Sequence, residues 1–420
     1  MINLIKKNFL GILFSIILFF ILHEIALIFM WERITLTAKL PKMNVELHDN
    51  QRFYCSEIKK RTQFHKVYGW HEIPNSKYFE VRNKKPKIHS YNHLGFRGSL
   101  ENPEKLPVVM VLGDSMVRGT IADDLDTMPE VMNRFTDDFK FLNFGMGGTG
   151  TINQYLIFRE NYKEFNPSIV VLFISNSNDI ENNLEGYNRS IKNHPRPYTI
   201  NDNNEIILLK EAERKSKILY RIEDLKEKKN KNQNFFTKNF QKFKDFLRNN
   251  TKLYLFYHAK VKELFIRKKD GSNERVIDYE LGFEITEKIL INLNNLIKNE
   301  GAKLIILDVP EPYEIDKKKN YSRHEDAKKY GKNLRNFLGS LADKENFIFF
   351  TPLDTLKEKQ SNDGDVFGFP DMHLNEFGYY TVAEFLINKM YDLNIIHNKN
   401  NSAKFNVQDV DPLKINCAEY

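Results

Sequence analysis

Cysteine is scarce in this chain, with two residues among 420. Cys55 and Cys417 stand far apart, and neither belongs to a CxxC or zinc-binding spacing, which excludes a thioredoxin-like redox motif and a cysteine-ligated metal. The pair could form one disulfide outside the cytoplasm or remain two separate thiols. The sequence leaves both alternatives open.

Metal-ligand clusters and nucleic-acid motifs are missing as well. The stretch "HEIAL" at His23 lacks the second histidine of a zinc protease, and no other ligand cluster occurs. The formal net charge is +7, but the 63 basic residues are interspersed with 56 acidic ones and form no dense basic stripe. We therefore expect no metal ion and no nucleic-acid partner.

The chain has one long apolar run, at residues 9–31, broken only by the polar pair His23 and Glu24. Its length suits a single bilayer crossing. Two lysines precede it, which favours a cytoplasmic N-terminus at residues 1–8, and no cleavage site follows it. We predict an uncleaved membrane anchor with the rest of the chain outside the cytoplasm; the alternative is a buried helix of the globular domain.

Five short apolar segments read as strands of one sheet: Val108–Leu112, Phe141–Phe144, Ile169–Ile174, Lys303–Val309 and Phe347–Phe350. Three of them are continuous apolar runs, as expected of parallel strands covered on both faces. Helical patterns separate them, including one whose apolar face is formed by Ile285, Ile289, Leu293, Leu296 and Ile297 and which Gly301 ends. Strands that alternate with helices predict a doubly wound α/β sheet.

The predicted domain spans residues 99–395, after a lead-in at 32–98 and before a polar tail at 396–420. The alternation of strand and helix patterns is interrupted at residues 186–278 by a lysine- and asparagine-rich segment. We interpret this segment as a mainly helical insertion. The aromatic stripe in "NFFTKNFQKFKDFLRNN" is typical of core packing; a basic helix on a membrane surface is the alternative.

The first strand ends in "VVMVLGDSMVRGT", where a buried run stops at Gly113 and presents Ser115. A tight turn of this kind holds a side chain at the carboxyl edge of the sheet, where ligands of open α/β sheets bind. Backbone N–H groups at the start of the next helix would favour developing negative charge. Ser115 is therefore a candidate nucleophile, although a capping Ser or Asp in an ordinary turn gives the same pattern.

A serine hydroxyl needs a base, and "DMHLNEFGYYTVAEFL" near the C-terminus supplies one. His373 is the candidate base, and Asp371 could orient its imidazole. Taken alone, the stretch would read as a surface Asp and His before a helix capped by Asn375.

Two further segments could bind a developing oxyanion. "NFGMGGTGT" lets backbone N–H groups approach a substrate closely, with Gly148 as the donor, and "FISNSNDI" presents the Asn178 amide at the end of the third strand. The glycines also spell G-x-G-x-x-G, so a dinucleotide-binding oxidoreductase is an alternative. It is weakened because the motif follows the second strand and no acidic residue closes the next one. An Asx turn is the plain alternative for Asn178.

In this order the four segments resemble the SGNH/GDSL hydrolases. "GDS" resembles the nucleophile block, "NFGMGG" the second block, "NSND" the third and "DMHLN" the last. "YGWHEIPN" and "NHLGFRGS" look like the lead-in of a larger, membrane-anchored bacterial branch. The resemblance covers roughly residues 65–185 and 280–390. The chain departs from the family pattern at two places. Asn176 replaces the glycine of the third block, and the last block is D-x-H, as in membrane-linked relatives that acetylate glycans.

The resemblance implies a flavodoxin-like fold with five parallel strands, no metal and no organic cofactor. It assigns Ser115, His373 and Asp371 to catalysis, and the oxyanion hole to the Ser115 and Gly148 N–H groups with the Asn178 amide. We expect an esterase acting on short acyl esters of a glycan or lipid. The alternatives are an O-acyltransferase that modifies a cell-envelope glycan and a non-catalytic binding protein on the same fold. Nothing in the sequence indicates the oligomeric state.

Overall fold

A computed structural model of the chain describes residues 9–34, 37–40, 45–48, 52–55, 61–82, 85–175, 178–184, 198–200, 206–208, 278–316, 325–368, 373–400, 403 and 405. By contacts the chain divides into two compact units. The smaller consists of Met1–Gln51, Val81–Lys85 and Tyr220–Val276, and the larger of Arg52–Glu80, Pro86–Leu219 and Ile277–Tyr420.

The smaller unit contains helix α2 (Phe9–Ile34) and the antiparallel strands β1 (Thr37–Leu40) and β2 (Val45–His48). Helix α2 covers the predicted anchor at 9–31. Within the described part of the chain, no helix reaches the combined length and hydropathy of a membrane span. The anchor therefore stays a prediction.

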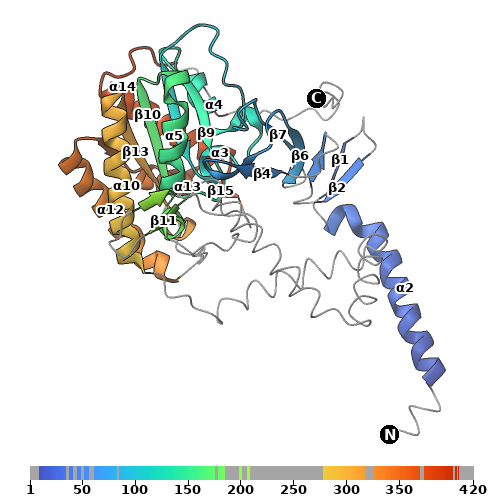
Figure 1. The fold of residues 1–420 in the computed structure, drawn as a ribbon. Coiled ribbons are helices and arrows are strands. Elements are labelled where there is room, and N and C mark those ends of the chain that lie inside the picture. The colour runs from blue at the N-terminus through green and yellow to red at the C-terminus, as the bar shows by residue number, and fades with distance from the viewer. Residues whose placement is uncertain are drawn as a thin grey trace. The chain divides into compact units, whose positions relative to one another are not determined.

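The larger unit is built on one five-stranded sheet (Figure 1). Its strands are β8 (Val108–Gly113), β9 (Lys140–Gly145), β10 (Ile169–Ser175), β13 (Lys303–Val309) and β14 (Ile348–Phe350). All pair in parallel, in the order β14-β13-β10-β8-β9. All five predicted strands are confirmed, each within one residue at either end.

This strand order is the flavodoxin-like order, in which the first strand in sequence lies between the second and the third. Strand β9 lies on one side of β8. Strands β10, β13 and β14 follow one after another on the other side. The order therefore reverses between β8 and β10. The crevice outside the carboxyl ends of two such strands is where open α/β sheets bind ligands.

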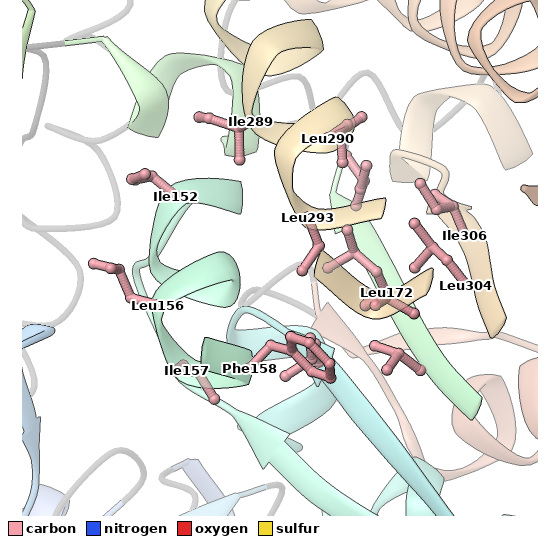
Figure 2. Packing of buried hydrophobic residues seen from close by; sticks show 14 of the residues in the cluster. Ile152, Leu156, Ile157, Phe158, Leu172, Ile289, Leu290, Leu293, Leu304 and Ile306 are labelled. Atoms are coloured by element: carbon pink, nitrogen blue, oxygen red, sulfur yellow. The ribbon is translucent and has the colours of Figure 1, made fainter. Parts of the chain in front are cut away.

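Side chains of each central strand alternate between two cores. In β10, Val170, Leu172 and Ile174 pack on one face, and Ile169, Val171 and Phe173 on the other. Continuous apolar strands are required here because helices cover both faces. Figure 2 shows the first core, where Leu172 of β10 lies beside Leu293 of α10; Ile289 of α10 and Ile152 and Leu156 of α5 belong to the same cluster.

The first core lies under α5 (Thr151–Phe165), α10 (Tyr279–Asn299) and α12 (Glu325–Glu345), and the second under α4 (Met128–Phe135), α13 (Leu353–Asn362) and α14 (Glu376–Asp392). The predicted apolar face of α10 is confirmed, and Gly301 follows that helix with a φ of 75°. The larger unit also contains several short elements: α3 (Ser115–Arg118), the 3-10 turn Asp124–Asp126, α6 (Asp179–Asn183), α11 (Pro312–Ile315), β15 (Phe367–Gly368) and β16 (His373–Leu374).

The lead-in is more structured than its sequence pattern suggested. It forms β3 (Arg52–Tyr54), β4 (Thr62–His65), β5 (Gly69–Glu72), β6 (Lys77–Arg82) and β7 (Lys85–Ser90). Tyr68, Trp70 and Phe96 enter the first core, so the part of the lead-in that belongs to the larger unit packs as part of the α/β unit.

Two predictions fall partly outside the described residues. In the insertion the structure describes only β11 (Tyr198–Ile200) and β12 (Ile206–Leu208), which pair antiparallel. The predicted aromatic helix of the insertion lies outside the described residues. Cys55 is disulfide-bonded, and Cys417, the other cysteine of the sequence, lies outside them too.

A buried histidine in β5 makes a pH-dependent contribution to stability. His71 is 2% exposed and packs against Phe96 and Tyr68, with ring centroids 4.5 and 5.5 Å away. Burial lowers the pKa of His71 to about 4. Because the unfolded chain binds the proton near pH 6.5, the stability that depends on neutral His71 is lost as the pH falls towards 4.

We predict that the free energy of unfolding falls between pH 7 and pH 4 and that His71→Leu makes this decline shallower. Urea unfolding followed by fluorescence over this pH range measures both slopes. His93→Leu, at an exposed position, is the control and should keep the wild-type slope. Equal slopes for His71→Leu and the wild type would contradict the assignment.

Candidate active site

Ser115 stands where the sequence placed it, at the first position of α3, directly after β8. Asp114 caps this helix, its side chain accepting a hydrogen bond from the Met116 N–H at 2.8 Å. Gly113 allows the sharp turn because a Cβ there would lie 2.4 Å from Val117 Cγ2. Asp114 is buried and Ser115 is partly buried, so the turn leaves the serine hydroxyl accessible while fixing its backbone.

His373 reaches Ser115 from the far end of the sequence. It lies in β16, which pairs with β15 through Gly368, and its Nε2 is 2.8 Å from Ser115 Oγ across 258 residues. The imidazole is buried, with 7% of the residue exposed. A tautomer protonated at Nδ1 would leave Nε2 to accept the serine proton, which is the geometry of a nucleophile with its general base.

The serine hydroxyl has a second, weaker neighbour. Asp114 Oδ2 lies 3.4 Å from Ser115 Oγ, a longer contact than the one to His373. Asp371, the predicted partner of the imidazole, lies outside the described residues, so its role stays a prediction. Among the described residues, no group of three or more His, Cys, Asp or Glu side chains could hold a metal ion.

Gly148 lies in the loop that follows β9. Its φ of 76° is in the left-handed region, which glycine adopts without strain. The residue is exposed, and a Cβ there would meet nothing within 4 Å, so the space beside its backbone is open. The loop begins with the Met146 N–H donating to the Gly113 carbonyl at 2.9 Å, which ties it to the turn before Ser115.

Buried polar side chains hold the rest of this loop. Gln154 donates to Thr149 Oγ1 at 2.7 Å, and Thr149 donates to the Met146 carbonyl. From α6, Asn182 donates to the Thr149 carbonyl at 3.1 Å. The loop therefore depends on contacts from both α5 and α6, which is the rigidity that a preorganised hydrogen-bond donor requires.

The glycine-rich stretch does not have the environment of a dinucleotide site. A Cβ at Gly145 would lie 2.3 Å from the Arg118 N, one at Gly147 2.8 Å from Arg118 Cζ, and one at Gly150 2.6 Å from Asn183 Oδ1. The telling position is Gly147, the second glycine, because Arg118 fills the space that a dinucleotide fingerprint leaves there to a pyrophosphate.

Asn178 lies at the carboxyl end of β10, on the other side of the strand-order reversal from Ser115. It is partly buried and precedes α6 as its N-cap residue. The next residue, Asp179, is buried, and burial together with the nearby Asp114 raises the pKa of Asp179 well above its ordinary value. Burial therefore favours the neutral form of the Asp179 carboxyl.

The sequence did not reveal that charged residues of the lead-in contact the end of α3 and the loop that follows it. Arg97 is fully buried and pairs with Asp124 at 2.8 Å. Its guanidinium also donates to the backbone carbonyls of Ile88, Arg118, Gly119 and Ala122. Arg97 therefore fixes the loop that leaves α3. It stands in "NHLGFRGS", directly after the buried Phe96.

Comparisons with known proteins find similar solved structures but no matching family. No protein-family model and no curated protein matches the chain. Similar solved structures include TesA (12% identity, 68% of this chain and 99% of that chain, TM-score 0.36). They also include a GDSL-like lipase from Bacteroides thetaiotaomicron (11%, 70% and 93%, 0.35) and a lipase/acylhydrolase from Enterococcus faecalis (11%, 70% and 100%, 0.36). At these identities and TM-scores, the likeness carries no assignment of family or activity.

Close packing between β9 and α3 makes Gly145 intolerant of a side chain. We predict that Gly145→Ala lowers the free energy of unfolding by about 3 kcal/mol, because the new Cβ would collide with backbone atoms of Val117 and Arg118. The control is Gly339→Ala in α12, where a Cβ meets nothing within 4 Å, so that alanine should stabilise by up to about 1 kcal/mol. Urea unfolding measures both; a Gly145→Ala protein of wild-type stability would contradict the packing.

Proposed function

We propose that this protein is a serine esterase of the SGNH kind that cleaves short acyl esters. The observation that carries the proposal is the 2.8 Å contact between Ser115 Oγ and His373 Nε2 at the carboxyl edge of the sheet. A serine hydroxyl within hydrogen-bond distance of an imidazole, at the sheet edge where ligands of open α/β sheets bind, has the geometry of a nucleophile with its general base.

The chemistry proceeds in two steps. His373 Nε2 takes the Ser115 proton as Oγ attacks the ester carbonyl, and the tetrahedral intermediate collapses when the imidazolium protonates the departing alcohol. A water molecule then gives its proton to His373 and attacks the acyl-serine, which releases the acid and regenerates the hydroxyl. Asp371 would support the imidazolium by accepting a hydrogen bond from its Nδ1–H.

The oxyanion would be bound by the backbone N–H groups of Ser115 and Gly148 and by the Asn178 side-chain amide. Support comes from the left-handed, exposed backbone of Gly148 and from the place of Asn178 at the end of the strand beside β8. Donors that are preorganised in this way stabilise developing negative charge more than water does.

The acceptor in the second step decides between hydrolysis and transfer. Water gives an esterase, whereas a glycan hydroxyl gives an O-acyltransferase. Incubation with a labelled acetyl ester, with and without an acetyl-free glycan, separates them: label in free acetate marks hydrolysis, and label in the glycan marks transfer. We propose hydrolysis as the basal reaction because any open acyl-serine site admits water.

We predict that Ser115→Ala lowers kcat/KM for a short acyl ester by at least about a thousandfold and abolishes labelling by a fluorophosphonate probe. His373→Gln should lower kcat/KM to a similar extent because the serine loses its base. The control is Ser361→Ala, at an exposed position in α13, which should keep wild-type activity. Turnover by Ser115→Ala at the wild-type rate would reject the proposal, as would a wild-type protein that neither labels nor hydrolyses any ester.

We also propose that α2 anchors the protein in a membrane with the α/β unit outside the cytoplasm. Several of its apolar side chains are exposed, among them Phe14, Phe19 and Leu22. The bonded state of Cys55 supports an oxidising compartment, where disulfides persist.

This location predicts that the full-length protein stays with membranes in alkaline carbonate and in high salt. Protease added to intact cells stripped of any outer barrier should degrade the α/β unit. Recovery of the protein in the soluble fraction, or protection from protease until the cells are lysed, would reject the location.

A further inference from the structure

Arg118 is a buried cation three residues after the candidate nucleophile. It is 4% exposed and ends α3. Its guanidinium pairs with Glu72 Oε1 at 2.6 Å and donates to Thr120 Oγ1 at 2.9 Å. Glu72, itself 3% exposed, ends β5 of the lead-in, so the ion pair joins that segment to the nucleophile helix.

The Arg118 side chain also forms the support for the glycine-rich loop. A Cβ at Gly147 would lie 2.8 Å from Arg118 Cζ and 2.9 Å from Nη1, so the loop backbone rests directly on the guanidinium. Gly148, the proposed oxyanion donor, is the next residue. Any shift of the guanidinium would therefore move the backbone that carries the Gly148 N–H.

We propose that Glu72 is a positioning residue for the oxyanion hole, which it sets by holding the Arg118 guanidinium under Gly147. The inference rests on the proposed esterase function, because it needs Gly148 to act as an oxyanion donor. The chain of contacts runs from Glu72 Oε1 to Arg118, which are both buried, and from Arg118 to Gly147, which is partly buried.

Loss of the Glu72 carboxylate should change the position of the Arg118 guanidinium. An arginine side chain has many rotamers, and a buried guanidinium that loses its carboxylate must find other acceptors or move towards water. Among the described residues, Arg118 Nε has no hydrogen-bond partner, so Glu72 and Thr120 carry the polar contacts of the guanidinium. An oxyanion donor acts mainly in the transition state, so its misplacement lowers kcat more than it raises KM.

The lead-in offers a matched control. Glu80 in β6 is as buried as Glu72, at 1% exposed, and pairs with Arg52 at 2.9 Å. Arg52 lies in β3, so the Arg52–Glu80 pair links two strands of the lead-in sheet. Glu72 Oε2 also lies 3.4 Å from Arg61 Nε. Glu72→Gln and Glu80→Gln thus each remove a buried carboxylate that pairs with an arginine of the lead-in, but only Glu72→Gln also removes the Arg118 pair that supports the Gly147 loop.

The experiment compares the two variants of the full-length protein on a short acyl ester. We expect Glu72→Gln to lower kcat by at least about tenfold with KM changed less than threefold, and to weaken inhibition by a short alkyl boronic acid by a similar factor. A boronate on Ser115 carries an oxygen where the oxyanion would lie, so it reports the donors directly. Glu80→Gln should keep kcat and boronate inhibition within about twofold of the wild type.

Each possible outcome either supports or overturns the inference or rejects the proposed function. Wild-type kcat and boronate inhibition in a folded Glu72→Gln protein would overturn the inference, as would equal losses in Glu72→Gln and Glu80→Gln. If Glu72→Gln does not fold, Glu72→Asp replaces it: a kcat at least threefold lower supports the inference, and an unchanged kcat overturns it. A wild-type protein without ester turnover rejects the proposed function instead, before any variant is compared.

Discussion

The parallel pairing of β8 with β10 is the interaction on which this molecule depends. Their register, with Val109 opposite Ile169 and Leu112 opposite Leu172, brings two carboxyl ends to one edge of the sheet. Because β9 lies on the other side of β8, the loop that carries Gly148 comes to the same edge. The pairing therefore brings the segments that carry Ser115, Gly148 and Asn178 to the same edge of the sheet.

A second set of contacts keeps that edge in place, and it is made of buried charges. Arg97 and the Glu72–Arg118 pair hold the turns around α3, while Lys87 pairs with Glu376 at the start of α14, three residues after His373. Buried charges are costly unless they are paired, so each pair tolerates few alternative arrangements. The lead-in thus acts on both the serine side and the histidine side of the site.

Several parts of this arrangement follow from local sequence patterns. The runs that form β8 and β10 are apolar up to their last residue, and the run that forms β13 is apolar apart from Lys303 and Asp308, as expected of a parallel sheet covered on both faces. Ser115 and His373 were identified from residue type and context, and the structure brings them together. The lead-in could not be predicted in the same way, since its strands are three to six residues long and their burial depends on partners distant in sequence.

By itself, the sequence determined the strands, the helix faces and the small set of side chains able to carry acyl chemistry, because these are encoded in periodicity and residue type over a few neighbours. Only the tertiary structure decided that His373 reaches Ser115, that the glycines of the second motif rest on Arg118, and that Glu72 holds that arginine. The physical reason is that each of these contacts joins segments far apart in the chain, and their distance in space is set by packing of the whole sheet and its helices.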